Sequence, residues 1–596
     1  MCSLQRARLI FDLPATSVLP SLRRTHSSPP TFHGHLSCSS LFATPTRWPT
    51  RRAVSLVAHP RSDLFKYTSG RWLVNDELRR AERRRYFNVD ELRRLAAESV
   101  ERKPDDVERL EKLAEGGFNR IFLITMRDGF RMVARIPYPA TTPKYLAVAS
   151  EVATLAFLRS VKLPVPEVYG YSPTPDNAAG TEYIFMQFVE GSSLSDVLPN
   201  LKEGDIISIL RQLAQLESKM MSMAFPAGGS LYFPEDLAKA PRSASGPIRP
   251  GIALENKLFC VGPETSLLLW YGRRAQLDVD RGPYDSSHAA LVSGPAKELA
   301  YLRKFGRPLL PRERARRYIY GYEEQQPSDH IENLGRYLDI TPSLVSRDQA
   351  RDYFCIRHPD LQPSNIIVGR SPDSKSYVVV GLIDWQHTSI LPLSLHAGIP
   401  QQLLNYDDAG WELMTPPSLP ENLDDLNETE QGREKELYCY RLIHYHYVKN
   451  TEKYNILHYA TLTDPMDSLR RRLFGYARAL WDGETVELKA TLIEATENWE
   501  LLTGVSSPCP VVFGPDDIRE TMKLLAAQTE ADGDLQACRG RIGVGPEDWV
   551  SVEHYEEVMA HIEKVKKLGL AAIDEEERAQ VVANWPFDDM EEDDYL

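Results

Sequence analysis

Short apolar runs in the first third of the chain predict a small antiparallel sheet. Three of them lie close together, at residues 110–115, 121–126 and 131–136. A Gly-Gly pair and an Arg-Asp-Gly turn separate these runs, which is typical of hairpin strands. A helical pattern begins at Ser150, and a fourth strand-like run covers 182–188. The pattern therefore predicts a sheet with one helix inserted before its last strand.

The hydrophobic pattern of the rest of the chain is mainly helical. Beyond Gly432 the spacing of apolar residues is that of amphipathic helices. Clear examples of helical patterning lie at 205–224, 516–528 and 553–568. One hairpin interrupts this part of the chain, because the β-branched runs 366–368 and 377–383 flank a turn-rich loop.

Polar residues stand at the open end of this predicted hairpin. Asn365 directly precedes the first strand and Asp384 directly follows the second, so the two side chains should lie together. Amide and carboxylate oxygens suit Mg²⁺, which needs few protein ligands when phosphates and waters complete its shell. Asp360 lies five residues before Asn365, in a loop that His358 would brace. The Asp360 carboxylate could accept a proton from, or orient, an attacking hydroxyl group.

Each of these residues also has a purely structural explanation. Asp and Asn are common in turns and at helix caps, and an aspartate often follows a strand. A single residue of this kind would indicate nothing about function. The ordered set of His358, Asp360, Asn365 and Asp384, with a hairpin between its halves, favours a phosphoryl-transfer site.

The stretches HPDLQPSN and LIDW resemble the catalytic loop and metal-binding segment of the kinase-like superfamily, in particular the aminoglycoside phosphotransferase and choline kinase families. The resemblance implies an α+β, bilobal protein-kinase-like fold. A small antiparallel N-lobe with one helix would precede a large, mainly helical C-lobe with insertions. The resemblance also implies ATP and Mg²⁺ as cofactors, Asn365 and Asp384 as metal ligands, and Asp360 with His358 as catalytic residues.

The same resemblance assigns the ATP phosphates to the first hairpin and the third strand. Gly116 and Gly117 would let backbone amides approach phosphate oxygens, although a plain hairpin turn also explains this pair. The run Val133-Ala134-Arg135-Ile136 matches the strand that carries the phosphate-binding lysine of kinases, but the residue here is Arg135. Arginine keeps the charge and can bind phosphate through two bonds, yet its planar fork does not substitute freely for an ammonium group.

Glu151 and the segment Gln187, Phe188 and Val189 complete the predicted ATP site. Glu151 falls in the first turn of the predicted helix, where it could pair with Arg135. An acid favoured by the helix dipole is the alternative explanation. The run QFVEG resembles the hinge that lines the adenine pocket, where backbone groups usually bind the base.

The sequence favours a small-molecule acceptor over a protein acceptor. Gln362 replaces the lysine that serine/threonine protein kinases usually have, and Asp384-Trp385-Gln386 replaces Asp-Phe-Gly. No Ala-Pro-Glu sequence follows. These substitutions resemble the aminoglycoside phosphotransferase group, but no residue identifies the acceptor.

The first 62 residues have the composition of a mitochondrial transit peptide. They contain eight arginines, no lysine, one acid and 16 serines or threonines. A disordered basic tail and a misassigned start are the alternatives. No apolar run approaches the ~20 residues needed to cross a bilayer. We therefore expect no transmembrane segment and a soluble protein of the mitochondrial matrix after the leader is removed.

Charge and cysteine content argue against several other classes of protein. The net charge of -14, which loss of the basic leader would make more negative, argues against nucleic acid as a partner. Seven scattered cysteines without a Cys-x-x-Cys pair argue against a disulfide framework or a structural zinc. Residues 574–596 carry ten acids and one base, which is typical of a solvated tail but also fits an arm that docks a protein.

The order of these features predicts five regions. They are a disordered transit peptide (1–62), a helical N-terminal extension (63–105), an ATP-binding N-lobe (106–190), a C-lobe with the catalytic loop and inserts (191–573), and the acidic tail (574–596). The motifs YTSGRW, VARIP, HPDLQPSN and IDWQHTSI behind such a leader resemble the fungal "altered inheritance of mitochondria" branch of the aminoglycoside phosphotransferase family.

Two hypotheses about function differ in kind. The first is an ATP- and Mg²⁺-dependent phosphotransferase that acts on the hydroxyl group of an unidentified small molecule in mitochondria. The second is a catalytically weak kinase-like scaffold that binds a metabolite or a protein through the inserts or the acidic tail. Arg135 and the long stretch 191–351 support the scaffold. The pair Asn365 and Asp384 argues against it, because two such oxygens are unfavourable to bury together without a cation.

Overall fold

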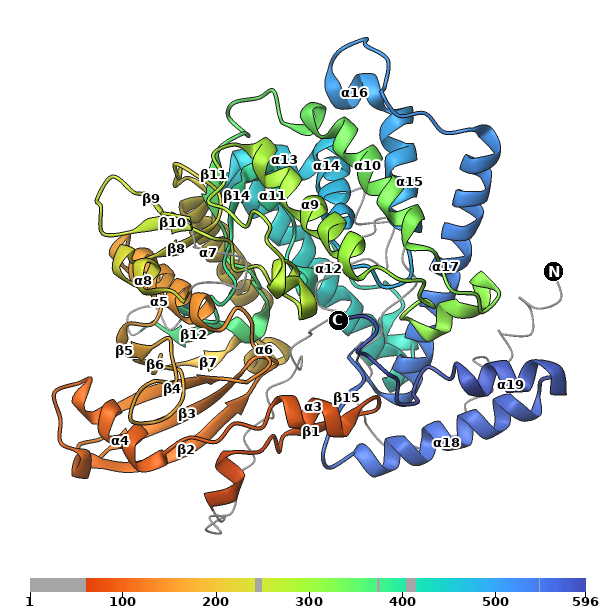
Figure 1. Ribbon diagram of the computed structural model, residues 1–596. Coiled ribbons are helices and arrows are strands. Elements are labelled where there is room, and N and C mark those ends of the chain that lie inside the picture. The colour runs from red at the N-terminus through yellow and green to blue at the C-terminus, as the bar shows by residue number, and fades with distance from the viewer. Residues whose placement is uncertain (1–60, 242–248, 372–375, 404–413, 546) are drawn as a thin grey trace.

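The computed structural model describes residues 61–241, 249–371, 376–403, 414–545 and 547–596, and it has two lobes (Figure 1). The predicted α+β, bilobal architecture is confirmed. A small lobe built around one sheet lies at the lower left of Figure 1, and the helices of the large lobe fill most of the remainder. The predicted transit peptide lies, except for its last two residues, outside the described residues.

Five antiparallel strands form the sheet of the small lobe, in the order β2-β3-β4-β6-β5. Their bounds are β2 Val107–Glu115, β3 Asn119–Met126, β4 Arg131–Pro137, β5 Val168–Ser172 and β6 Tyr183–Gln187. The three apolar runs near the start of the lobe thus become β2, β3 and β4. The two predicted turns connect these strands as hairpins.

Each face of this sheet is covered by a helix, because successive strand residues point to opposite sides. The face toward α4 (Val89–Glu98) contains Phe122, Ile124, Ala134 and Phe185. The face toward α5 (Lys144–Ser160) contains Val133, Ile184 and Met186. Helix α5 is the inserted helix, whereas α4 comes from the N-terminal extension. The extension is therefore part of the small-lobe core.

The extension also joins the far end of the chain. Its short strand β1 (Gly70–Trp72), followed by α3 (Asp76–Glu82), pairs antiparallel with β15 (Trp549–Ser551). A side chain at Gly70 would meet the Trp549 ring at 2.2–2.4 Å, so glycine is needed for this close approach. Residues separated by almost 480 positions consequently form one ribbon beside the small lobe (Figure 1).

Helices make up most of the large lobe. Their bounds are α6 Leu194–Val197, α7 Glu203–Met221, α8 Pro234–Lys239, α9 Ser287–Phe305, α10 Pro327–Leu344, α11 Leu393–His396, α12 Glu428–Tyr454, α13 Ile456–Thr463, α14 Pro465–Ala477, α15 Val486–Glu497, α16 Trp499–Thr503, α17 Pro515–Ile542, α18 Tyr555–Ala571 and α19 Glu575–Ala583. Within the part of the chain that the structure describes, none of the helices has the length and apolar character of a membrane span.

Short strands lie between these helices. Two small sheets have three strands each, β13 (Tyr377–Leu382)-β12 (Ile366–Arg370)-β7 (Ser192–Ser193) and β8 (Ser230–Tyr232)-β10 (Cys260–Gly262)-β9 (Ile252–Ala253). Strands β11 (Phe354–Ile356) and β14 (Ile390–Pro392) form a pair. The predicted hairpin is thus present as β12 and β13. The long stretch 191–351, which lies between the predicted hinge and the catalytic loop, contains the β8-β10-β9 sheet.

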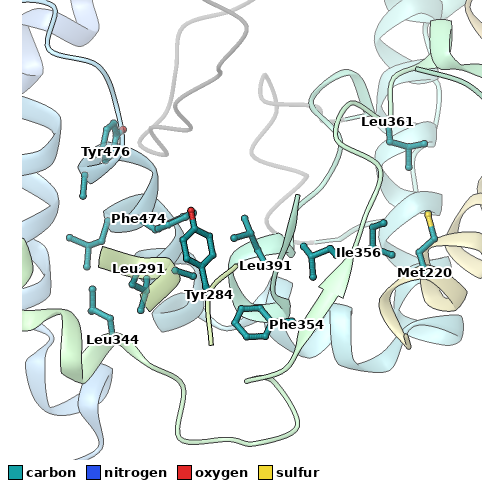
Figure 2. Packing of buried hydrophobic residues seen from close by; sticks show 14 of the residues in the cluster. Met220, Tyr284, Leu291, Leu344, Phe354, Ile356, Leu361, Leu391, Phe474 and Tyr476 are labelled. Carbon is teal, nitrogen blue, oxygen red and sulfur yellow. The ribbon is translucent and has the colours of Figure 1, made fainter. Parts of the chain in front are cut away.

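One hydrophobic core extends through the large lobe. Figure 2 shows part of it, with side chains of α7, α9, α10 and α14 packed around β11 and β14. The labelled residues are Met220, Tyr284, Leu291, Leu344, Phe354, Ile356, Leu361, Leu391, Phe474 and Tyr476. Strands β11 and β14 flank the predicted catalytic loop and the segment after Asp384, so the core fixes the backbone on both sides of the candidate site.

The acidic segment 574–596 is not a solvated tail, because its aromatic residues are buried and several of its acids are paired. Trp585 is only 1% exposed and Tyr595 6%. Arg314 donates to three backbone carbonyls within residues 585–589. Glu592 forms an ion pair with Arg79 of α3. Positive groups from distant parts of the chain therefore hold this segment in place.

We predict that Trp585→Ala lowers the free energy of unfolding by about 3–5 kcal/mol, the usual range for truncating a buried aromatic side chain. Chemical denaturation followed by tryptophan fluorescence and circular dichroism would measure the change. The matched control Glu591→Ala alters an exposed acid of the same segment and should change stability by less than about 0.5 kcal/mol. Equal stability of the parent and Trp585→Ala would show that the segment does not pack as described.

Candidate functional site

The loop 358–365 is braced by His358. Its Nδ1 accepts a hydrogen bond from the backbone N–H of Asp360 at 3.1 Å, so the ring proton lies on Nε2, which donates to the Ile383 carbonyl at 2.9 Å. The ring also packs on Trp385, with 4.4 Å between centroids. Burial lowers the pKa of His358 to about 4, which keeps the ring neutral at pH 7. His358 thus ties the loop to the end of β13.

Asp360 is held by the side-chain amides of two neighbours. Asn365 Nδ2 donates to the Asp360 carbonyl at 2.9 Å and to its carboxylate Oδ2 at 3.2 Å. Gln362 Nε2 donates to the same Oδ2 at 2.5 Å. Burial and the negative charge of Asp384 raise the pKa of Asp360 to about 6, and the two amides oppose that shift. Asp360 is therefore mainly ionised at neutral pH, with a pKa close to the range in which a general base works.

Asn365 and Asp384 stand at the same end of the hairpin. Strands β12 and β13 pair with Ile366 opposite Leu382, and the Ile383 N–H donates to the Asn365 carbonyl at 3.0 Å. Asp384 has a left-handed backbone with φ 67°, and its side chain is 37% exposed. Asn365 uses its amide nitrogen within the loop, so its side-chain oxygen is the atom it can offer to a cation. This donor set suits Mg²⁺.

Arg135 links both lobes at this point. It forms an ion pair with Glu151, and its Nη2 donates to Asp384 Oδ1 at 2.7 Å. Arg135 is 5% exposed and Glu151 3%. Burial lowers the pKa of the Arg135 guanidinium, whereas the Asp384 charge raises it. The buried cation is thereby shared between a helix of the small lobe and the hairpin of the large lobe.

The prediction that Glu151 lies in the first turn of its helix is wrong. Helix α5 begins at Lys144, after Pro143, so Glu151 lies two turns inside the helix. An interior position excludes the explanation that Glu151 only favours the helix dipole, because that effect is confined to the first turn. The ion pair with Arg135 is instead the contact that explains a buried acid here.

Gly116 and Gly117 form the turn between β2 and β3, as predicted from the sequence. The Gly116 N–H donates to the Asn119 carbonyl at 2.9 Å, which closes the turn. A Cβ atom at Gly116 would meet only that carbonyl, at 3.6 Å, an ordinary contact. Packing within the protein therefore does not explain glycine at 116, and close approach by a ligand remains a physical reason for it.

The base of this glycine hairpin is fixed by the N-terminal extension. Glu115 Oε2 accepts hydrogen bonds from the backbone N–H groups of Thr68 and Ser69 at 2.8 and 2.9 Å. Its Oε1 pairs with Lys112 and Arg120. Burial raises the pKa of the Glu115 carboxyl, but Lys112 and these hydrogen bonds outweigh burial and hold it below the usual value. The YTSGRW motif thus has a structural role beside the predicted phosphate loop.

The predicted hinge connects the lobes. Gln187 ends β6, and its N–H donates to a backbone carbonyl at 2.7 Å. Phe188 stacks under the guanidinium of Arg131, with 4.5 Å to the ring centroid. Val189 packs against Gly381, where a Cβ would approach to 2.8 Å. The hinge residues therefore run alongside β13 on their way into the large lobe.

A loop of the insert supports the segment after Asp384. His387 Nδ1 lies 2.7 Å from the Thr265 carbonyl, and Ser389 donates to Glu264 at 2.9 Å. The other side of His387 faces the glycine hairpin, where its ring lies edge-on to Phe118 with 5.4 Å between centroids. The insert thus reaches the tip of the glycine hairpin through one histidine.

The C-terminal ribbon adds an acid near Asp360. Glu547 lies two residues before the start of β15, and burial raises its pKa to about 9. Arg83 opposes this shift, whereas the negative charges of Asp548 and Asp360 add to it. A residue far outside the catalytic loop is consequently close enough to interact electrostatically with Asp360.

Sequence reasoning missed four residues of this neighbourhood, Asn119, Gln386, His387 and Glu547. The first three flank motifs that were recognised, so their position beside GGF and IDW was the available signal. Glu547 had no such signal, because only the pairing of β1 with β15 brings it to the site.

Comparison with known proteins groups the chain with phosphotransferases. A model described as "Phosphotransferase enzyme family" matches residues 109–394. The subtelomeric hrmA-associated cluster protein of Aspergillus fumigatus is 30% identical over 518 residues, which cover 81% of this chain and 97% of that protein. Altered inheritance of mitochondria protein 9 of Yarrowia lipolytica is 27% identical over 402 residues, covering 63% of this chain and 66% of that protein.

Similarity to solved structures is more distant. Plasmodium vivax ethanolamine kinase has 15% sequence identity and a TM-score of 0.29, covering 71% of this chain and 83% of that chain. A putative fructosamine-3-kinase from Thermobifida fusca has 14% identity and a TM-score of 0.31, covering 73% and 100%.

We predict that the free energy of unfolding of His358→Gln falls less steeply with decreasing pH than that of the parent protein. The folded-state pKa of His358, about 4, lies below the ordinary histidine value of 6.5, so between these values the unfolded chain binds a proton that the folded chain excludes. Stability therefore falls as pH falls through this window, by up to about 1.4 kcal/mol per pH unit for one proton. Glutamine removes that contribution. Urea unfolding at pH 4.5–7 would measure it, and equal slopes for parent and variant would contradict the prediction.

Proposed function

This chain belongs to the aminoglycoside phosphotransferase family, and from that premise we propose that it transfers the γ-phosphoryl group of ATP, with Mg²⁺, to a hydroxyl group of a small molecule. One observation carries the proposal: Asp360, Asn365 and Asp384 lie together at the mouth of the β12–β13 hairpin. A base and two oxygen ligands for a cation are the minimum that such a transfer requires of the large lobe.

The residues present suit a nucleotide and its metal ion. Asn365 and Asp384 offer one amide oxygen and one carboxylate, and Asp384 is partly exposed beside its buried neighbours. Gly116 has no packing reason to be glycine. Arg135 brings a positive charge to the same point. Oxygen ligands, a backbone that a phosphate can approach and one cation are the features of a phosphate-binding site.

The roles of the side chains follow from their environments. Mg·ATP would supply the phosphoryl group and the positive charge of its metal. Asp360 would accept the proton of the attacking hydroxyl group, because it is ionised at neutral pH and its pKa of about 6 makes it more basic than an exposed aspartate. Glu151 would hold Arg135 in place while the guanidinium binds phosphate oxygens. His358 would keep Asp360 facing the hairpin.

A catalytically weak kinase-like scaffold remains the second candidate, and one observation favours it. Arg135 already neutralises Asp384, the carboxylate that a metal ion would need. If that ion pair persists in the presence of Mg·ATP, the chain has the kinase-like fold but does not transfer a phosphoryl group. Nucleotide binding separates the two candidates directly.

We predict that Mg·ATP at 100 times its dissociation constant stabilises the parent protein by about 2.7 kcal/mol. Asp384→Ala should abolish this stabilisation, because it removes the carboxylate that the metal ion requires. Thermal shift of residues 63–596, with and without Mg²⁺, would measure both effects. The absence of any shift in the parent protein would favour the scaffold.

The matched variant Asp360→Asn keeps the size of the side chain but removes the base. It should therefore bind Mg·ATP like the parent while releasing ADP about 10²–10⁴ times more slowly in the presence of a fungal polar-metabolite extract. Unchanged ADP release by Asp360→Asn would contradict the assigned role of Asp360.

We further propose that the protein acts in mitochondria. Support comes from the Arg-rich, acid-poor composition of residues 1–62 and from the similarity to proteins named mitochondrial in Yarrowia lipolytica and Clavispora lusitaniae. We expect residues 1–62 fused to a fluorescent protein to enter mitochondria in a fungal cell. The same segment with its arginines changed to glutamine should remain in the cytosol. Cytosolic fluorescence from the unaltered fusion would contradict the proposal.

A further inference from the structure

Two side-chain amides meet the guanidinium of Arg135. Arg135 Nη2 donates to Gln386 Oε1 at 2.6 Å, and Asn119 Nδ2 donates to the same oxygen at 2.6 Å. Rotated by 180°, the Asn119 amide would instead place its oxygen 3.1 Å from Arg135 Nε. In either orientation, an amide oxygen lies against the guanidinium.

These amides come from two different parts of the site. Asn119 begins β3 directly after the glycine hairpin, and Gln386 lies two residues after Asp384. Asn119 is 8% exposed and Gln386 7%, so both depend on protein partners for their hydrogen bonds. Arg135 therefore contacts the glycine hairpin, helix α5 and the hairpin end of the large lobe at the same time.

The chemistry of the partners explains why arginine is present. Arginine has five N–H donors in a planar fork, whereas lysine has three on one compact ammonium group. Glu151 binds Nη1 and Asp384 binds Nη2 of the guanidinium, and the two carboxylates compensate its charge. Gln386 accepts a further hydrogen bond from Nη2, and the Asn119 amide holds Gln386 or, when rotated, accepts from Nε. Both amides are neutral, so they leave the positive charge available to another anion.

We propose that Asn119 and Gln386 are positioning residues that hold Arg135 where a nucleotide phosphate can replace Asp384 as its partner. The inference rests on the proposed function. Asp384 would turn to the metal ion while the two amides and Glu151 keep the guanidinium in place. Arginine has enough N–H donors to bind all of these groups at once, whereas a lysine at the same position would not.

A double-mutant cycle with Arg135→Lys and Gln386→Ala tests this coupling. Isothermal titration with Mg·ATP should show at least tenfold weaker binding for Gln386→Ala in the parent background, which corresponds to about 1.4 kcal/mol. In the Arg135→Lys background the same change should alter affinity by less than about twofold, because lysine no longer uses the amide. In urea unfolding without nucleotide, the double variant should lose less stability than the sum of the losses of the two single variants.

Gln386→Glu provides a test of the charge argument, because it keeps the shape and adds a negative charge. It should weaken Mg·ATP binding by more than tenfold in a protein that still folds, as circular dichroism would verify. Unchanged affinity for Gln386→Glu would overturn the inference.

Gln212 of α7 supplies the matched control. Its amide is also held by hydrogen bonds at both ends, to the Tyr377 carbonyl at 3.1 Å and from the Val379 N–H at 3.0 Å. The losses of stability caused by Gln212→Ala and by Arg135→Lys should be additive. Gln212→Ala should leave the affinity for Mg·ATP unchanged.

The outcomes separate this inference from the proposed function. Additive effects of Gln386→Ala and Arg135→Lys in a parent protein that binds Mg·ATP overturn the amide positioning alone. A parent protein that binds no Mg·ATP contradicts the proposed function and, with it, the phosphate role of Arg135. In that case the unfolding cycle still shows whether the amides hold Arg135.

Discussion

The site depends on one buried cation, Arg135, placed where the two lobes meet. A buried charge is unfavourable unless it is paired, and removal of one partner from such a set is strongly destabilising. Arg135 belongs to the small-lobe sheet, Glu151 to the helix on that sheet, and Asp384 to the hairpin of the large lobe. The electrostatics of one side chain consequently fix the relative position of the glycine hairpin and the predicted metal ligands.

Asp360 is linked to the same set through charge. Its pKa is raised partly by Asp384, so any cation that binds Asp384 would lower the pKa of Asp360 and make it a weaker base. The Arg135 pair and the metal ion would act on Asp360 in the same direction. The raised pKa of Asp360 therefore depends on desolvation of its carboxylate in the loop that His358 and Asn365 hold, and not on the charge of Asp384 alone.

Segments outside the region that matches the family complete the surroundings of the site. The family match covers 109–394, yet Thr68 and Ser69 bind the base of the glycine hairpin, and Glu547 lies near Asp360. Both segments directly precede or lie within two residues of the strands β1 and β15, which pair with each other. The two ends of the chain thus contribute to one wall of the site, which gives the extension and the C-terminal region a reason to be present beyond stability.

Local patterns predicted what depends on neighbours in sequence. The β12–β13 hairpin, and with it the proximity of Asn365 and Asp384, followed from two β-branched runs and a turn. The start of α5 was missed because its first turns are buried and apolar, and Pro143 was the available boundary signal. The acidic segment was misjudged because its partners, such as Arg79 and Arg314, lie hundreds of residues away. The two amides beside Arg135 likewise required knowledge of tertiary contacts.

In the proposed function, Asp384 exchanges Arg135 for a divalent cation when nucleotide binds. Mn²⁺ can replace Mg²⁺ in oxygen-ligand sites and is visible by electron paramagnetic resonance. A titration of Mn²⁺ with the protein and a non-hydrolysable ATP analogue would detect the exchange directly. We expect one tightly bound Mn²⁺ per chain in the presence of the analogue, and we expect Asp384→Asn to lose it. Equal Mn²⁺ binding by the parent and by Asp384→Asn would contradict it.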